Sequence, residues 1–223
     1  MPELEIIGVP LSNYVRSLRM MCEEKGVPYR INPALPHSPD VNAIHPAGQI
    51  PCMRHGDVKL FESKAIANYI DKMFSGPNLF PDNPIEAAKV EQWVSYCNVK
   101  VDRWLIREFV VPSVLFDKTK GPDTAKIAAA LPEIEKCAKV LDEAVAATGY
   151  LVGNRLTYAD CNVFPMLATA LNFPQGKDII NRYKDLSAYI AKLSERSSYK
   201  KSLGERTLAE LSTEVVASVR GAR

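Results

Sequence analysis

The chain has 223 residues, 47% hydrophobic and 24% charged, a balance typical of a folded protein with a sizeable core. Its 28 lysines and arginines against 26 aspartates and glutamates give a formal charge of +2 with no obvious basic stripe, so nucleic acid is not an expected partner. Because no apolar run approaches a membrane span and the N-terminus does not resemble a secretory signal, we expect a cytoplasmic protein that does not bind membranes.

The five cysteines are odd in number, scattered along the chain and mostly surrounded by apolar sequence. This distribution favours reduced thiols in a cytoplasm over a disulfide framework. Their spacing matches no zinc site, and we expect no bound metal.

The beginning of the chain alternates strand-like and helix-like patterns. A short apolar run at 4–9 predicts a buried strand, and apolar residues on one face of 14–25 predict a helix. Gly26 stands where a helix C-terminal glycine belongs, and 29–32 has the pattern of a second strand.

A hairpin and a helix follow this unit. The segments 52–55 and 58–61 flank a Gly-Asp pair, which is typical of a tight antiparallel turn, and 63–74 has a helical pattern. The order strand, helix, strand, hairpin, helix predicts a thioredoxin-like α/β domain, although other small α/β folds share it.

A segment rich in proline and asparagine then interrupts regular structure. We place the α/β domain at 1–75, the linker at 76–84 and an all-α domain at 85–223. Asn83 is the expected cap of the first helix of the second domain, and Pro84 suits its first position.

Further helices are predicted along the second domain. The apolar pattern at 127–145 ends before Gly149, and Pro132 either kinks this helix or starts a new segment. Thr157 opens another helix, where its hydroxyl and the Asp160 carboxylate are placed to form a cap.

One motif of the N-terminal part is more specific than these patterns. The sequence His-Pro-Ala-Gly-Gln-Ile-Pro ends at Pro51, and eleven residues later Glu62-Ser63 opens a helix. Together these segments resemble the N-terminal domain of soluble glutathione transferases, which carry a similar Gly-x-Ile/Val-Pro segment and then a Glu-Ser pair. The resemblance implies the glutathione transferase fold, a thioredoxin-like domain followed by an all-α domain.

The resemblance also implies a glutathione site. In the family the proline is cis, and the backbone of Ile50, before Pro51, would pair with the cysteinyl residue of glutathione like an added strand. The helix start at Ser63 would bind the γ-glutamyl carboxylate, and Glu62 would hold the α-ammonium group. Taken alone, Glu62-Ser63 would be only a helix cap.

Two side chains add weaker matches. Gln49 stands where relatives contact the backbone of the tripeptide, and His37 stands where relatives use His or Lys to bind the glycine carboxylate. A solvated loop histidine is an equally good interpretation of His37.

The activating residue should follow the first strand, and Ser12 is our candidate. Its spacing to Arg16 resembles the arrangement of serine-type transferases, particularly those of the phi class. The hydroxyl would donate a hydrogen bond to the thiolate of glutathione and would not itself be a nucleophile. There are two alternatives: Ser12 only caps the helix, or Tyr14 activates the thiol.

The second substrate is expected in a hydrophobic pocket between the domains. By position in the family, Tyr14, Asp102 and Arg103 are candidates to line it, although a solvated helix face explains the last two equally well. The resemblance implies conjugation of glutathione to a small hydrophobic electrophile, with peroxidase activity as an addition. A non-catalytic glutathione-binding protein and a glutathione-dependent isomerase are the alternatives, and the Ser-Ser-Cys signature of the isomerases is absent.

Some positions depart from the family. A homodimer is expected, but Ala47 lacks the aromatic side chain that phi-type dimers often insert into the partner subunit. An additional amphipathic segment at 204–223 would cover either the pocket or the helical domain.

Overall fold

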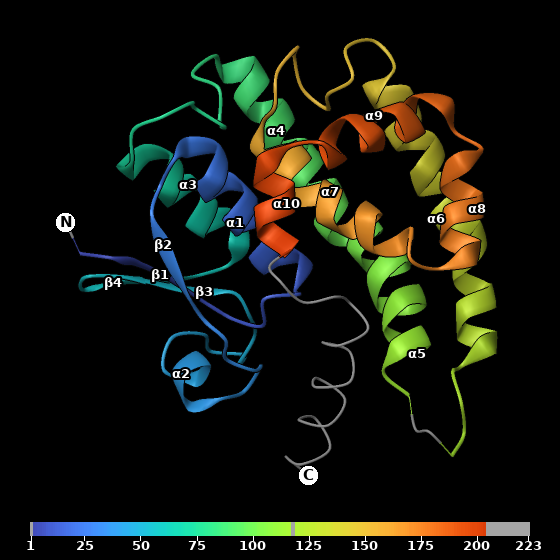
Figure 1. The fold of residues 1–223 in the computed structure, drawn as a ribbon, viewed down its shortest axis with the longest axis horizontal. Coiled ribbons are helices and arrows are strands. Elements are labelled where there is room, and N and C mark those ends of the chain that lie inside the picture. The colour runs from blue at the N-terminus through green and yellow to red at the C-terminus, as the bar shows by residue number, and fades with distance from the viewer. Residues whose placement is uncertain (1, 117–118, 204–223) are drawn as a thin grey trace.

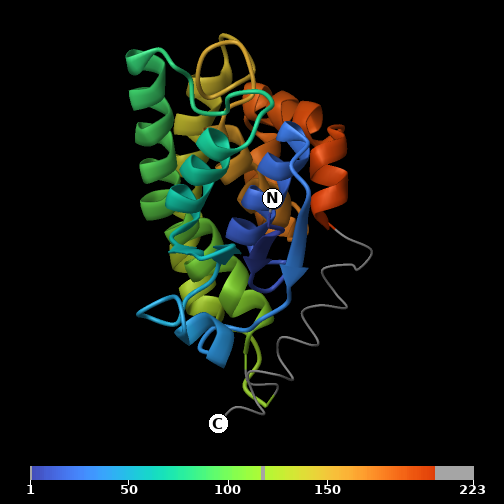
Figure 2. The same ribbon diagram turned by 90° about the vertical axis from the view of Figure 1, so that its left-hand side faces the viewer.

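The computed structural model describes residues 2–116 and 119–203, so the expected segment 204–223 lies outside the described residues. A mixed sheet with three helices forms one part of the molecule, and a group of helices forms the other (Figures 1 and 2). This is the glutathione transferase fold expected from the sequence. No helix in the described ranges is long and apolar enough to cross a membrane.

The sheet has four strands in the order β2-β1-β3-β4. β1 (Leu4–Ile7) pairs in parallel with β2 (Tyr29–Asn32) and antiparallel with β3 (Cys52–His55), and β3 forms a hairpin with β4 (Val58–Phe61). The predicted strands and hairpin are confirmed. The first strand is two residues shorter than expected, because Ile7 already pairs with the last residue of β2.

Two helices of this part lie on the face of the sheet that meets the helical domain (Figure 1). α1 (Asn13–Lys25) packs against α3 (Ser63–Met73) and also against the helical domain, and it ends as predicted at Gly26, whose φ is 70°. A one-turn helix that the sequence did not predict, α2 (Pro39–Asn42), covers the other face, where Val41 packs in a separate small apolar cluster.

The described elements after residue 83 are all helical. Asn83 caps the first of them, because its side-chain oxygen accepts from the amides of Ile85 and Glu86 at 2.9 and 3.1 Å. The helices are α4 (Pro84–Tyr96), η1 (Cys97–Val110), α5 (Val111–Val114), α6 (Thr124–Val145), α7 (Tyr158–Ala170), α8 (Pro174–Asn181), α9 (Lys184–Ser194) and α10 (Ser197–Leu203).

The segment η1 is a π-helix of 14 residues that continues directly from α4. In a π-helix each amide bonds five residues back, one more than in an α-helix. The sequence predicted an ordinary α-helix here. The π-helix therefore changes which side chains share a face.

The structure answers two questions about the helical domain that the sequence did not decide. α6 continues through the exposed Pro132 to Val145, so Pro132 does not start a new segment. At the start of α7 the amide and hydroxyl of Thr157 donate to the Asp160 carboxylate at 2.8 and 3.0 Å, which confirms a cap built from these two residues. α7 is buried along its whole length and forms the centre of the core.

All five cysteines are free and buried, as expected for reduced thiols. Burial raises the pKa of Cys52, next to Pro51, to about 11. A thiol with so high a pKa is a poor nucleophile at neutral pH.

Candidate functional site

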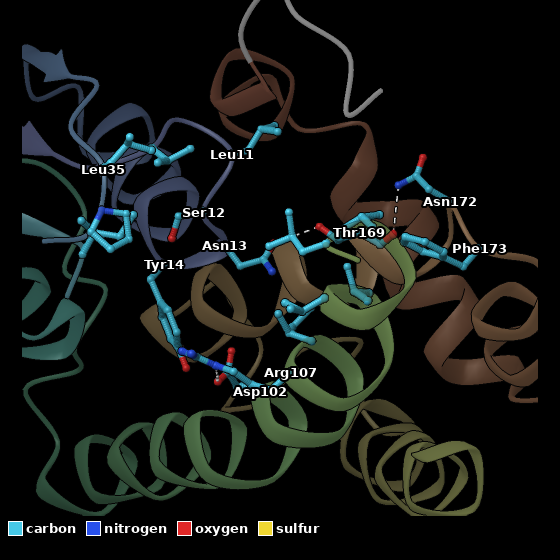
Figure 3. Close-up of a pocket in the computed structure, with 18 residues that line it drawn as sticks. Leu11, Ser12, Asn13, Tyr14, Leu35, Asp102, Arg107, Thr169, Asn172 and Phe173 are labelled. Carbon is cyan, nitrogen blue, oxygen red and sulfur yellow. Dashed lines mark hydrogen bonds and ion pairs between the residues drawn. The ribbon is translucent and has the colours of Figure 1, made fainter. Parts of the chain in front are cut away.

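An apolar cavity of about 380 Å³ lies between the two parts of the molecule (Figure 3). Its lining comes from the loops that follow β1 and β2, from η1 and α5, and from the end of α7. Apolar side chains provide most of the wall, among them Leu11, Leu35, Ile50, Ile106, Val110 and Phe173. A small hydrophobic molecule of the kind expected from the sequence fits such a surface.

Ser12 lies at the edge of this cavity, immediately before α1. Its backbone is fixed, since its amide donates to the Val9 carbonyl at 2.9 Å and its carbonyl accepts from the Arg16 amide at 2.8 Å. Its side chain makes no capping hydrogen bond to α1. The plain cap that the sequence left open is therefore not formed, and the hydroxyl stays available to a ligand.

The loop that ends in a cis Ile50-Pro51 bond runs beside Ser12 and contributes Ile50 to the cavity. Gly48 in this loop has a φ of 63°, which glycine adopts without strain. A Cβ at Gly48 would lie 2.2 Å from Nδ1 of His37, whose amide donates to the Gly48 carbonyl at 2.8 Å. The exposed His37 is thus held against this loop.

The start of α3 lies beside the same loop. Glu62 precedes the helix with an unusual φ of 67°, and its side chain is exposed. α3 has no side-chain cap, so the amides of its first turn, beginning with the buried Ser63, are available to an anion. Gln49, in the Gly48–Pro51 loop, is exposed.

A polar group of three residues interrupts the apolar wall. Nε of Arg107 donates to Oδ2 of Asp102 at 2.9 Å, and the Tyr14 side chain lies beside this pair (Figure 3). Burial raises the pKa of Tyr14 well above its usual value, and the Asp102 charge raises it further, so the phenol stays protonated. Burial also raises the pKa of Asp102, against the opposing effects of Arg107 and Tyr14.

Arg103, proposed from the sequence, does not line the cavity. Its side chain is exposed and its guanidinium lies 4.6 Å from the centre of the Trp104 ring. Arg107 pairs with Asp102 instead, five residues further on, the spacing of the backbone hydrogen bonds in a π-helix. Arg107 was not predicted, because no sequence pattern indicates a π-helix here.

A second polar group, also missed, joins α1 to α7. The Thr169 hydroxyl donates to Oδ1 of Asn13 at 2.9 Å and accepts from Nη1 of Arg16 at 3.3 Å. Arg16 is buried, and within the described part of the chain its Nε and Nη2 have no hydrogen-bond partner. Burial lowers the pKa of this guanidinium, although the Tyr199 ring, 5.3 Å away, stabilises its charge.

Among the described residues, no group of three His, Cys, Asp or Glu side chains is placed to hold a metal ion. The polar groups at the site are instead hydroxyls, backbone amides, one guanidinium and carboxylates. They suit an organic ligand that carries its own charges.

Comparison with known proteins gives two family matches that cover most of the chain. Residues 6–78 match the glutathione S-transferase N-terminal domain, and residues 107–206 match the glutathione S-transferase C-terminal domain. Among curated proteins, glutathione S-transferase 3 of Zea mays is 31% identical over 76% of this chain and 80% of its own length. A stringent starvation protein A homolog of Haemophilus ducreyi is 27% identical over 86% of this chain and 85% of its own.

Solved structures agree with these matches. Poplar glutathione transferase F1 superposes with a TM-score of 0.81 at 25% identity, covering 91% of this chain and 97% of its own. The theta class glutathione S-transferase of Xanthomonas axonopodis pv. citri, solved with glutathione bound, has a TM-score of 0.78 at 26% identity and covers 92% and 99%.

Proposed function

Because this chain belongs to the glutathione S-transferase family, we propose that it joins the thiolate of glutathione to small hydrophobic electrophiles. The main support for this proposal is the position of Ser12. Its side chain makes no capping hydrogen bond and lines an apolar cavity beside the Ile50-Pro51 loop. Reduction of organic hydroperoxides would use the same thiolate. Detoxification in the cytoplasm is the corresponding role.

Glutathione would bind along the N-terminal part of the site. The backbone of Ile50 would pair with the cysteinyl residue, and the uncapped start of α3 at Ser63 would bind the γ-glutamyl carboxylate. The exposed Glu62 carboxylate suits the α-ammonium group. Gln49 and His37 would contact the rest of the tripeptide, and the structure of a relative with glutathione bound supports this ligand.

Ser12 would lower the pKa of the bound thiol. A hydroxyl donates more strongly to a thiolate than to a thiol, so the bond favours ionisation. A fall in the thiol pKa from about 8.5 to about 6.5 would raise the ionised fraction at neutral pH from about 3% to about 75% and requires about 2.7 kcal/mol. One charged hydrogen bond of about 1.5 to 3 kcal/mol, helped by the α1 dipole, provides that much.

The electrophile would occupy the apolar cavity. The thiolate sulfur attacks an electron-poor carbon, a C–S bond forms, and a leaving group such as chloride departs with the electron pair of its former bond. Tyr14, Asp102 and Arg107 would contact polar parts of the substrate, while Leu35, Ile106 and Phe173 would pack on its apolar part. This wall, not Ser12, would determine which electrophile is accepted.

A homodimer is also proposed, since dimers are typical of the family. Ala47, exposed on its loop, provides no aromatic anchor for a partner subunit. Sedimentation of the purified chain would show whether the dimer forms, and a monomer at micromolar concentration would contradict it.

The second candidate function is glutathione binding without turnover. The stringent starvation protein A homolog supports it, because the family includes members that are not named as transferases. Retention on a glutathione column is expected of both candidates, whereas release of chloride from 1-chloro-2,4-dinitrobenzene faster than its uncatalysed reaction with glutathione is expected only of an enzyme.

The test compares the unaltered chain with Ser12→Ala and Ser12→Thr. We expect turnover of the aryl halide by the unaltered chain, a fall in kcat/KM of about 100-fold in Ser12→Ala at neutral pH, and a smaller loss in Ser12→Thr, which keeps a hydroxyl. Glutathione binding without turnover by the unaltered chain would favour the second candidate.

A further inference from the structure

A buried tyrosine of the helical domain contacts the expected glutathione site from the protein interior. Tyr158, the first residue of α7, is 0% exposed. Its hydroxyl proton is shared between two acceptors, the Ser63 carbonyl oxygen at 3.2 Å and Oγ of Ser17 at 3.3 Å. A buried hydroxyl needs such partners, because one without any costs stability.

The contact continues from α3 into α1. Oγ of Ser17 donates to the Tyr14 carbonyl at 2.8 Å, in the first turn after Ser12. The Tyr158 hydroxyl therefore joins the first turn of α3, where the γ-glutamyl carboxylate would bind, to the first turn of α1, where the sulfur would lie. At both helix starts the backbone N–H groups point outward, and their directions determine how an anion is bound.

Tyr158 is itself held firmly. Its amide donates to the Leu79 carbonyl at 2.9 Å, and its ring stacks on Phe80 with centroids 5.3 Å apart and an interplanar angle of 25°. The helix that begins with it is capped by Oδ2 of Asp160, which accepts from the amide and hydroxyl of Thr157 at 2.8 and 3.0 Å. A hydroxyl on so rigid a support can fix the position of the backbone that it contacts.

The geometry points to Tyr158 as a positioning residue for glutathione, which holds the Ser63 backbone so that the first amides of α3 meet the γ-glutamyl carboxylate. This inference rests on the proposed function. It adds a residue that cannot touch the ligand, since Tyr158 is enclosed by protein on every side.

The test measures the Kd of glutathione by calorimetry for the unaltered chain and for Tyr158→Phe, which removes one oxygen. Loss of one buried hydrogen bond to the site backbone is expected to raise the Kd about fivefold. For 4-aminobutyryl-cysteinyl-glycine, which lacks the γ-glutamyl carboxylate, the Kd should be the same in both proteins. A merely structural role would weaken both ligands equally.

Tyr189→Phe is the matched control. Tyr189 is also buried, at 2% exposure, and its hydroxyl donates to Asp160 at 3.1 Å, within the helical domain. This variant should lose stability to thermal unfolding as Tyr158→Phe does, but it should keep the Kd of glutathione. Ser17→Ala breaks the same series of hydrogen bonds and removes fewer buried atoms. We expect it to raise the Kd of glutathione about twofold.

Three results would overturn the inference. The first is an unchanged Kd of glutathione in Tyr158→Phe. The second, which applies if Tyr158→Phe does not fold, is an unchanged Kd of glutathione in Ser17→Ala. The third is an equal rise of this Kd in Tyr158→Phe and Tyr189→Phe. Absence of glutathione binding by the unaltered chain would overturn the proposed function and this inference together.

Discussion

The two sides of the cavity are built in different ways. The proposed glutathione side consists mainly of backbone groups, in the loop at Gly48 and the uncapped start of α3. The proposed electrophile side consists mainly of side chains from η1, α5 and the region at the end of α7, with Tyr14 and Leu35 from the α/β part. Backbone groups recognise a fixed ligand that all members could share, whereas side chains can change without changing the fold. The comparison predicts that substitutions on each side will affect one substrate only.

The largest change in substrate affinity is expected on the proposed glutathione side, from Gly48→Ala. An added Cβ meets His37 and Asn42 at a φ of 63°, so the loop must shift, and the Kd of glutathione should rise about tenfold. Gly26→Ala is the control, since Gly26 has a φ of 70° but no atom within 4 Å of an added Cβ. It should lose about 1 kcal/mol of stability to denaturant and keep its affinity for glutathione. Equal affinity losses in both variants would contradict this assignment of the loop.

An intermediate effect is expected on the electrophile side, from Asp102→Asn. The change removes the charge paired with Arg107 and should alter the KM for the aryl halide by about threefold. The Kd of glutathione should not change. Arg103→Ala, on the neighbouring exposed residue, should alter neither constant. If Arg103→Ala changed the KM as much as Asp102→Asn, the cavity would be wrongly assigned.

The smallest effect on the site is expected from Glu24→Gln, remote from both sides. Nε and Nη2 of Arg196 donate to the two Glu24 oxygens at 2.6 Å each, and Ser198 also donates. Burial raises the pKa of Glu24, but these hydrogen bonds outweigh it, and the pKa falls below its usual value. Neither the Kd of glutathione nor the KM of the electrophile should change.

The stability of Glu24→Gln should depend on pH. Because the folded pKa of Glu24 is depressed, its stabilisation is present above the unfolded pKa of about 4.3 and is lost as the pH falls through the lower folded value. Urea unfolding should show a loss of about 1 to 2 kcal/mol at pH 7 and little difference at strongly acidic pH. Glu195→Gln, which breaks an exposed pair with Lys200, is the control and should show no detectable loss. A loss independent of pH would contradict a charge effect.

The two sides also differ in what the sequence revealed. Short-range signals predicted the hairpin, the Gly26 helix end, the Asn83 cap and the Thr157 and Asp160 cap, because each depends on residues close in the chain. The segments around Pro51 and Ser63 are equally local. This is why most of the fold could be predicted, and why the proposed glutathione side could be named from the sequence.

The remaining features depend on contacts between distant residues or on unusual backbone. Tyr158 and Ser63 are 95 positions apart, and Thr169 and Asn13 are 156 apart, so no local pattern links them. Arg107 pairs with Asp102 across five positions of the π-helix η1, whereas Arg103 was proposed only from its position in the family. The sequence therefore named Tyr14 and Asp102 in the cavity wall but not Arg107.

The pKa of the glutathione thiol in the binary complex tests the central claim most directly. It can be followed by the ultraviolet absorbance of the thiolate as the pH is raised, in the unaltered chain and in Ser12→Ala. We expect a thiol pKa below about 7 for the unaltered chain and a return towards the free value of about 8.5 in Ser12→Ala. Equal thiol pKa values in the two proteins would show that the Ser12 hydroxyl does not stabilise the thiolate.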